Sequence, residues 1–229
     1  AATMRGDTVT PSFAFCVAEK LGIAAPAFDV NAACVGVLYC MELADSLIST
    51  GKADKILIVS AEAMSKLVDW NDRASCVLFG DGSGAMVVGK GEGRLAGILS
   101  GKPDSVSIRM PSFEGESRFN EIKAEKMVMH MDGQEVYKFA VNAMGHEIEN
   151  VCKKAGIEPA EVDWFLPHQA NVRIVDACQK KFKIEKSKVL MNIAEYGNMS
   201  ATSIMVLLDE FAKKGTFHRG DKLLFVAFG

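Results

Sequence analysis

The sequence has no marked excess of charge of either sign: 26 lysines and arginines stand against 29 aspartates and glutamates, for a net charge of −3. This balance argues against a protein that binds nucleic acid or an anionic membrane through its overall field. No apolar run reaches the ~18 residues of a membrane span, and the N-terminal AATMRGDTVTPSF lacks the apolar core of a signal peptide. We therefore expect a protein that stays in the cytoplasm.

Metal-binding and disulfide patterns are also missing. The six cysteines form no C-x-x-C pair and are too dispersed for a disulfide framework, which suits free thiols in a reducing compartment: Cys16, Cys34, Cys40, Cys76, Cys152 and Cys178. His130, His146 and His218 fit neither H-E-x-x-H nor a zinc spacing. Trp70, Trp164 and the 13 phenylalanines form no basic and aromatic strip for single-stranded nucleic acid.

What the sequence does contain is a regular alternation of apolar runs and helical periodicity, with 49% hydrophobic residues. The apolar runs predict strands at 27–34, 55–62, 163–168, 188–193 and 222–228, with further turns and strands in 77–100. Helical spacing connects Val37 to Ile48 and covers 133–155, 171–182 and 200–215, while the polar stretch 111–126 predicts a surface excursion. This order predicts an α/β fold with a mostly parallel or mixed sheet, including a right-handed β-α-β unit over 27–62.

Three reactive side chains follow predicted strands, where open α/β sheets collect their functional groups. Cys34 follows AFDVNAA, His168 follows DWFLP, and Asn198 lies in the turn after KVLMNI. At a helix N-terminus the dipole would lower the pKa of the Cys34 thiol, and backbone N–H groups could hold an oxyanion. Taken singly, each residue has a structural explanation, as a small hydrophobe, a buried imidazole or a turn residue. Their coincidence at three matching positions favours a catalytic trio.

Four stretches make the sequence similar to a known family: NAACVG, FGDGSGA, PHQANVRI (167–174) and GNMSATS (197–203). They closely resemble motifs of β-ketoacyl-acyl-carrier-protein synthase III, the condensing enzyme that initiates bacterial fatty acid synthesis. The resemblance implies the thiolase-like fold, with layered helices, mixed β-sheets and pseudo-duplicated β-α halves. Residues 1–110 would be the remainder of the N-terminal half with the nucleophile, and 111–229 the C-terminal half with the histidine and asparagine.

The resemblance also implies roles for individual residues. Cys34 would carry the acyl group, and His168 and Asn198 would stabilise the enolate formed when a malonyl thioester loses carbon dioxide. Arg73, Gly133 and Asn171 match positions that bind coenzyme A and its pantetheine arm. The segment associated with the carrier protein would be Gln169, Ala170, Asn171, Val172 and Arg173. Acyl-CoA and malonyl-[acyl-carrier-protein] would be substrates, no metal or other cofactor is required, and a homodimer is expected.

The family pattern extends beyond both ends of this sequence. An N-terminal β-α segment with further coenzyme A contacts precedes the stretch that matches AATMRGD, and a glycine-rich loop and last strand follow Gly229. The sequence thus resembles a family member truncated at both ends. We expect a chain without these parts to leave sheet edges open and to be impaired in activity.

Four other interpretations of the sequence can be weighed against this one. A papain-like cysteine hydrolase shares the order Cys, His, Asn but lacks the local C-G-[SA]-C-[WY] signature here. GDGSGA (80–85) fits G-x-G-x-x-[GA], yet a β run follows it, so packing glycines are favoured over a dinucleotide loop. Another thiolase-superfamily acyltransferase of polyketide or secondary metabolism is possible, as is a non-catalytic module for acyl groups or a carrier protein. Such a module could dock an acidic carrier through Lys180, Lys181, Lys183, Lys186 and Lys188, although a solvated surface explains these lysines equally well.

Overall fold

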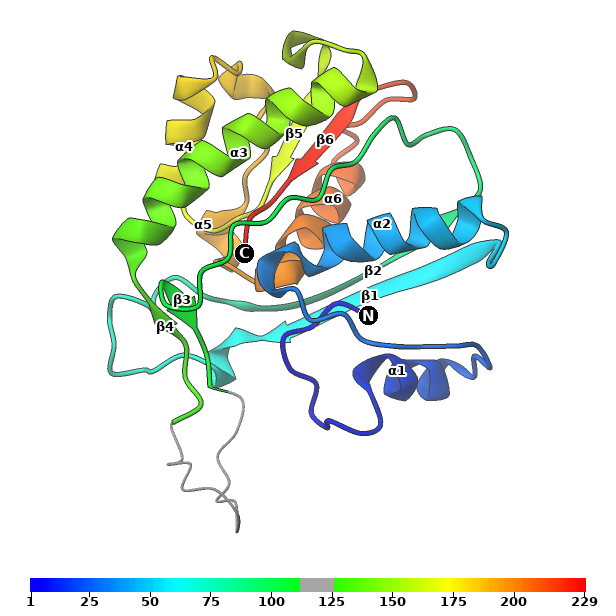
Figure 1. The fold of residues 1–229 in the computed structure, drawn as a ribbon, viewed down its shortest axis with the longest axis vertical. Coiled ribbons are helices and arrows are strands. Elements are labelled where there is room, and N and C mark those ends of the chain that lie inside the picture. Colours follow the sequence, from blue (N-terminus) through cyan, green and yellow to red (C-terminus); the bar gives the residue numbers. More distant parts are fainter. Residues whose placement is uncertain (112–125) are drawn as a thin grey trace.

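The structure is a computed structural model that describes residues 1–111 and 126–229, and Figure 1 shows the arrangement of its elements. The described helices are α1 (Phe13–Leu21), α2 (Gly36–Ser49), α3 (Gly133–Ala155), α4 (Val172–Lys181), α5 (Ile193–Tyr196) and α6 (Ser203–Lys213). Short 3-10 turns are η1 (Ala33–Val35), η2 (Met64–Lys66), η3 (Pro159–Glu161), η4 (Lys186–Lys188) and η5 (Ser200–Thr202). The described strands are β1 (Lys55–Ala63), β2 (Asp81–Gly89), β3 (Ile108–Arg109), β4 (His130–Met131), β5 (Trp164–Pro167) and β6 (Leu223–Val226). The predicted polar excursion lies almost entirely outside the described residues.

The longest strand pair is the antiparallel ribbon of β1 and β2, whose register runs from Lys55 opposite Gly89 to Ala63 opposite Asp81. Helix α2 lies along this ribbon (Figure 1) because its apolar side chains pack against the strands. The resulting core cluster also takes in one residue each of η5 and α6, so it joins segments far apart in the sequence: Ala2, Val37, Cys40, Ala44, Ile58, Ala201 and Met205. This core therefore crosses position 110, where the sequence predicts a boundary between two halves.

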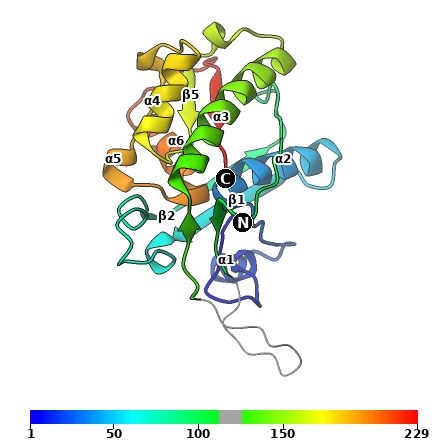
Figure 2. The same ribbon diagram turned by 60° about the vertical axis from the view of Figure 1, so that its left-hand side comes forward.

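Strands β5 and β6 form a parallel pair, from Trp164 opposite Leu223 to Pro167 opposite Val226. Their side chains alternate between two faces, as the pleat of a strand requires. Phe165 and Leu224 pack into the core beneath α3 and α4, whereas Leu166 and Phe225 pack toward α6. Helix α6 contacts both β5 and β2, so it lies between the two strand pairs, and Figure 2 shows α3 and α4 on the outer side.

Helix α3 confirms the predicted helix over 133–155 at both ends. Asp132 caps its start by accepting hydrogen bonds from the backbone N–H groups of Gln134 and Glu135. Gly156 ends it with a left-handed backbone (φ 72°), a conformation that glycine adopts without steric cost. This long, well-capped helix forms one wall above β5 and β6.

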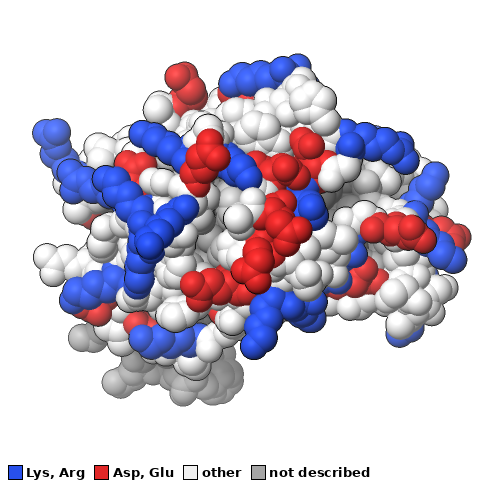
Figure 3. All heavy atoms as spheres, turned by 90° about the horizontal axis from the view of Figure 1, so that it is seen from above, with Lys and Arg blue, Asp and Glu red and all other residues white. Residues whose placement is uncertain are grey.

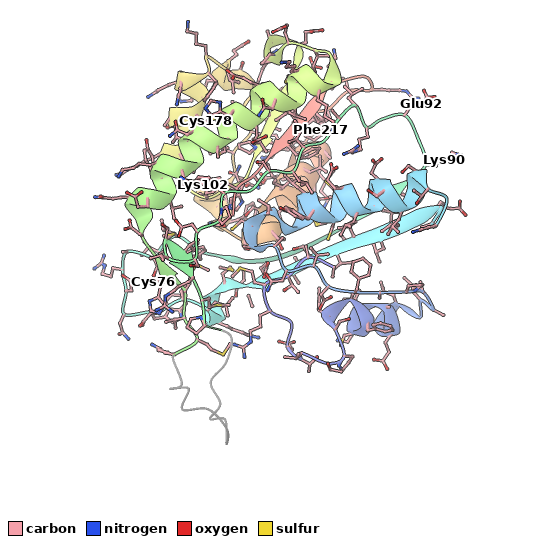
Figure 4. All side chains as sticks on the ribbon, viewed as in Figure 1. Cys76, Lys90, Glu92, Lys102, Cys178 and Phe217 are labelled. Carbon is pink, nitrogen blue, oxygen red and sulfur yellow. The ribbon has the colours of Figure 1, made fainter. Side chains whose placement is uncertain are left out.

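A connection from β2 to β3 runs between α2 and α3 (Figure 1), and Lys102 lies on it beside α3 in Figure 4. It is tied to α2 by the ion pair of Arg94 with Asp45 (2.9 Å). It is tied to α3 by Lys102, whose Nζ lies 5.9 Å from the centre of the Phe139 ring. The connection therefore spans the space between these two helices.

Two predicted strands are wrong. In 27–34 the only pairing among the described residues is a parallel bridge between Val30 and Ala2, and Ala2 makes a second parallel bridge to Ser60. The predicted β-α-β unit is thus reduced to single bridges, because the N-terminal residues lie between its two strands. In 188–193 the described pairing is one parallel bridge, from Val189 to Phe165, between η4 and α5.

The other predicted elements are confirmed with shifted ends. The strands at 55–62, 163–168 and 222–228 correspond to β1, β5 and β6, and β2 lies within 77–100. The helices predicted at Val37–Ile48 and 171–182 correspond to α2 and α4. The helix predicted over 200–215 begins as the 3-10 turn η5 and continues as α6. Over the part of the chain that the structure describes, no helix has the length and hydropathy needed to cross a membrane.

Candidate active site

Cys34, His168 and Asn198 line the same cavity, which has a volume of about 2380 Å³. Cys34 comes from η1 at the start of α2, His168 from the end of β5, and Asn198 from the loop between α5 and η5. Three side chains that are far apart in the sequence therefore share one cavity. Their surroundings decide what chemistry each can perform.

Two backbone features surround Cys34: a left-handed residue directly before it in the chain, and the close approach of Gly229. Ala33 adopts φ 43°, a left-handed conformation that L residues with a Cβ rarely take. This turn lets Cys34 stand at the entrance to α2, half-buried, with its backbone N–H among the first of the helical segment. Gly229 passes directly against it: a Cβ at Gly229 would lie 2.8 Å from the Cys34 backbone nitrogen. Only glycine fits this approach.

The electrostatic environment of Cys34 differs from the sequence prediction. The pKa of its thiol is raised to about 11, chiefly because burial disfavours the thiolate and, to a smaller degree, because the Glu62 carboxylate repels it. Hydrogen bonds from the Ser200 side chain and from the backbone N–H of Cys34 oppose this rise but are outweighed. The predicted lowering of the pKa by the helix terminus is therefore wrong, because burial outweighs it, and the cysteine is a thiol at neutral pH.

His168 is fully buried, and its position is fixed by its backbone N–H, which donates to the Val226 carbonyl (2.8 Å). The imidazole packs edge-on against Phe228, with ring centres 5.7 Å apart and planes at 73°. Within residues 1–111 and 126–229, neither ring nitrogen has a hydrogen-bond partner. Burial lowers the pKa of His168 to about 4, so the ring is neutral at neutral pH. One ring N–H is thus available to a bound substrate.

Asn198 is held by backbone pairing and by its own side chain. Its N–H donates to Leu78 O (2.8 Å) and its carbonyl accepts from Gly80 N (3.0 Å). Gly80 permits this approach, because a Cβ there would collide with the Tyr196 carbonyl oxygen. Asn198 Oδ1 accepts a hydrogen bond from the Ser200 backbone N–H (2.8 Å). The amide oxygen is therefore occupied, and the side-chain NH₂ is left as the donor.

The glycines of GDGSGA serve packing, as the sequence analysis favoured. Gly82 and Gly84 belong to β2, and Gly80 directly precedes this strand, so the motif does not form a loop before a helix. A Cβ at Gly82 would collide with the Met199 side chain, and one at Gly84 would lie 2.8 Å from Met205 Cβ. Close packing against the segment that carries Asn198 thus explains this motif, and it gives no support to dinucleotide binding.

Two of the three residues predicted to bind coenzyme A line the cavity. Gly133 lies at the first turn of α3, and Asn171 caps α4 by accepting from the Arg173 backbone N–H (2.9 Å). Arg73 is exposed on the segment between η2 and β2, outside the cavity lining, although its neighbour Ala74 belongs to that lining.

The segment 169–173 is only partly exposed. Gln169 is fully buried, donating to Pro167 O (2.7 Å) and accepting from the Asn192 backbone N–H (3.0 Å), so its side chain supports the fold and is unavailable to a carrier protein. Ala170 and Asn171 lie on the cavity lining, whereas Val172 and Arg173 are exposed at the start of α4.

Two of the lysines at the end of α4 and beyond it make contacts within the protein. Lys181 donates to Asn142 Oδ1 (2.6 Å), and Lys188 donates to the Val162 carbonyl (2.8 Å). On the face shown in Figure 3, basic side chains gather at the left-hand side with a few acidic ones among them, and acidic side chains group in the middle. These contacts favour the interpretation of the lysines as an ordinary solvated surface.

The sequence analysis missed two residues that act on the nucleophile. Glu62, at the end of β1, and Ser200, in η5, are both buried and both influence the pKa of Cys34. The signal for Glu62 was present, since a glutamate within a strand buried on both faces needs an explanation.

Comparison with known proteins places this geometry in a family. Residues 28–105 match the family model of 3-oxoacyl-[acyl-carrier-protein] synthase III, and residues 152–229 match the model of its C-terminal part. The chain is 39% identical over 235 residues to the β-ketoacyl-[acyl-carrier-protein] synthase III of Caldanaerobacter subterraneus subsp. tengcongensis, covering 100% of this chain and 71% of the relative. The corresponding enzyme of Aquifex aeolicus is 44% identical over 205 residues, or 89% of this chain and 63% of that protein.

Solved structures agree with the sequence matches. The crystal structure of the Thermus thermophilus β-ketoacyl-[acyl-carrier-protein] synthase III superposes with a TM-score of 0.92 at 38% identity, covering 100% of this chain and 72% of that one. A priming β-ketosynthase of the R1128 polyketide pathway superposes with a TM-score of 0.86 at 29% identity, covering 100% and 70%. The chain has the thiolase-like fold and belongs to the β-ketoacyl-[acyl-carrier-protein] synthase III family of condensing transferases.

Proposed function

We propose that this protein catalyses the first condensation of fatty acid synthesis, joining an acyl group from acyl-CoA to malonyl-[acyl-carrier-protein]. Cys34 carries the acyl group, and His168 and Asn198 assist the decarboxylation. The observation that carries the proposal is that all three side chains line one cavity, with two neutral hydrogen-bond donors beside a cysteine at a helix start.

The first half-reaction is acyl transfer to Cys34. Its sulfur attacks the thioester carbonyl, the bond to coenzyme A breaks, and the thiol of coenzyme A leaves. One thioester replaces another, so the intermediate keeps the reactivity needed for the next step. The backbone N–H of Cys34 is available to the developing oxyanion because it lies in the first turn of the helical segment.

The second half-reaction needs stabilisation of negative charge on a thioester oxygen. Loss of carbon dioxide from the malonyl group leaves an enolate, which then attacks the acyl carbonyl on Cys34. A neutral imidazole N–H from His168 and the amide NH₂ of Asn198 suit this oxygen because neither donor requires ionisation. This pairing also explains why His168 is buried with unpartnered ring nitrogens, since the substrate supplies the partner.

Substrate and carrier contacts belong to the same proposal. Gly133 and Asn171 line the cavity and would contact the pantetheine arm, and Arg73 would contact the nucleotide of coenzyme A. Val172 and Arg173 are the exposed side chains of the segment proposed to meet the carrier protein. No cofactor or metal takes part. We further propose a cytoplasmic homodimer, and the free state of the six cysteines suits a cytoplasmic location.

A second candidate is the priming condensation of a polyketide pathway, favoured by the structural similarity to the R1128 ketosynthase. Both candidates use the same residues and differ in the acyl group that the cavity accepts. The size of an acyl chain changes binding by about 1–3 kcal/mol per methylene group, so a series of chain lengths distinguishes them.

The experiment is to incubate the protein with a panel of acyl-CoA thioesters and to measure the mass of each cysteine-containing peptide. We expect an acyl adduct on Cys34, absent in Cys34→Ala and unchanged in Cys76→Ala. Subsequent addition of malonyl-[acyl-carrier-protein] should remove the adduct and release a β-ketoacyl product. An unmodified Cys34 across the whole panel would contradict the proposal.

A further inference from the structure

Glu62 is a carboxylate buried next to the nucleophile. It lies at the end of β1 with 4% of its surface exposed. Its two oxygens accept hydrogen bonds from the Met4 backbone N–H, at 3.1 and 3.2 Å, and Oε2 also accepts from Thr3 Oγ1 at 3.4 Å. These hydrogen bonds fix the carboxylate in place and leave its oxygens able to accept a proton.

Ser200 connects this carboxylate to Cys34. Its element η5 packs against both η1, which carries Cys34, and β1, which carries Glu62. The Ser200 side chain is fully buried, its Oγ donates a hydrogen bond to Met4 Sδ (3.3 Å), and it lowers the pKa of both the Cys34 thiol and the Glu62 carboxyl. Its backbone is held at φ 49°, so the hydroxyl is positioned by a strained turn that also directs the Ser200 N–H to Asn198. The Ser200 hydroxyl is therefore placed to connect the Cys34 thiol with the Glu62 carboxylate once it turns away from Met4 Sδ.

The surroundings of Glu62 give its carboxyl a pKa that suits a proton acceptor. Burial raises the pKa of its carboxyl to about 7, and hydrogen bonds from Met4, Ser200, Thr3 and Ala201 oppose the rise. Among the described residues, the groups that act on this pKa include no cation. Cys34 on η1 is the titratable group that interacts with it. The carboxyl thus changes its charge near neutral pH, the range in which a general base is most effective.

We propose that Glu62 is a positioning residue for acyl transfer and takes up the proton of Cys34 through the Ser200 hydroxyl. This rests on the proposed function. As the Cys34 sulfur attacks the thioester carbon, the thiol gives its proton to Ser200 Oγ, which gives its own proton to Glu62. The new S–C bond replaces the bond to coenzyme A, the leaving thiolate takes up a proton, and Glu62 returns to the carboxylate. No net proton is gained or lost.

The test measures single-turnover acylation of Cys34 by acetyl-CoA from pH 5.5 to 9. In the parent protein, the rate should rise with pH and level off near pH 7. Glu62→Gln keeps the shape of the side chain and an oxygen that accepts from the Met4 N–H, but it removes the carboxylate that acts as the base. Ser200→Ala removes the connecting hydroxyl and keeps the Glu62 carboxylate. Both should acylate about 10- to 100-fold more slowly at pH 8 and lose the inflection near pH 7. Glu19→Gln, an exposed carboxylate on α1, is the matched control.

Alkylation of Cys34 by iodoacetamide supplies a readout that needs no acyl donor. If Cys34 and Glu62 share a proton, the parent rate should level off above about pH 7, whereas the Glu62→Gln rate should keep rising roughly tenfold per pH unit. An inflection in alkylation without any acylation would refute the proposed function and leave the proton link standing. Parallel alkylation profiles for parent and Glu62→Gln, or Glu62→Gln acylating as fast as the parent, would overturn the role of Glu62. Circular dichroism and melting curves establish that the variants are folded.

Discussion

The Ser200 backbone N–H donates a 2.8 Å hydrogen bond to Asn198 Oδ1, and this bond determines which end of the Asn198 amide faces a substrate. Since the oxygen is occupied, the NH₂ group is the one available for a developing negative charge. A residue two positions away thus sets the polarity of the site.

Asn198→Asp tests this polarity. Aspartate still accepts from Ser200, but it replaces the donor with a second acceptor, so decarboxylation of malonyl-[acyl-carrier-protein] should fall by about 10²–10³. The measurement is release of labelled carbon dioxide. Acylation of Cys34 by acyl-CoA should persist, and an equal loss in both half-reactions would show that the substitution only disturbs the fold.

Gly80→Ala should damage both stability and catalysis. The added Cβ collides with the Tyr196 backbone carbonyl beside the loop that carries Asn198, so the strand or the loop must shift. We expect a loss of about 1–3 kcal/mol in the free energy of unfolding, together with slower decarboxylation. Gly91→Ala, where the same Cβ meets nothing within 4 Å, is the control and should melt like the parent.

Substitutions at Ala33 test the strained turn before the nucleophile. Ala33→Gly relieves the unfavourable φ of 43° and should change stability by less than about 1 kcal/mol. Ala33→Val places a β-branched side chain in a conformation that it strongly disfavours, so we expect a loss of about 2 kcal/mol or more and slower acylation of Cys34. Urea denaturation and adduct mass give the two readouts. Equal stability of the two variants would mean that the turn is unstrained.

Much of this arrangement could be predicted because it depends on local patterns. The helix over 133–155 carries its own capping residues, Asp132 and Gly156, and β1 reads as a continuous apolar run. Cys34, His168 and Asn198 could be grouped because each follows an extended segment, even though two of those segments make only single bridges.

The failures come from contacts between distant segments. The strand predicted at 27–34 was lost because Ala2 pairs with both Val30 and Ser60, which no local pattern reveals. The predicted direction of the Cys34 pKa shift was wrong because the sequence shows the helix start but not the burial of the thiol, which dominates the shift. Likewise, Gln169 follows the histidine in a motif that suggests exposure, yet Pro167 and Asn192 hold it inside.

His168 should also make the stability of the protein depend on pH. Burial lowers its pKa from 6.5 to about 4, so between these values the unfolded chain binds a proton that the folded chain excludes. The contribution of His168 to the free energy of unfolding is therefore fully present above about pH 6.5. It falls by an amount on the order of 3 kcal/mol as the pH drops toward 4. His168→Gln should reduce the loss measured by urea denaturation at pH 7 and pH 4.5. His218→Gln, at an exposed position, should keep the parent's dependence. If His168→Gln and the parent lost stability equally, the buried imidazole would have to be protonated in the folded state, and the neutral donor required for the enolate would be lost with it.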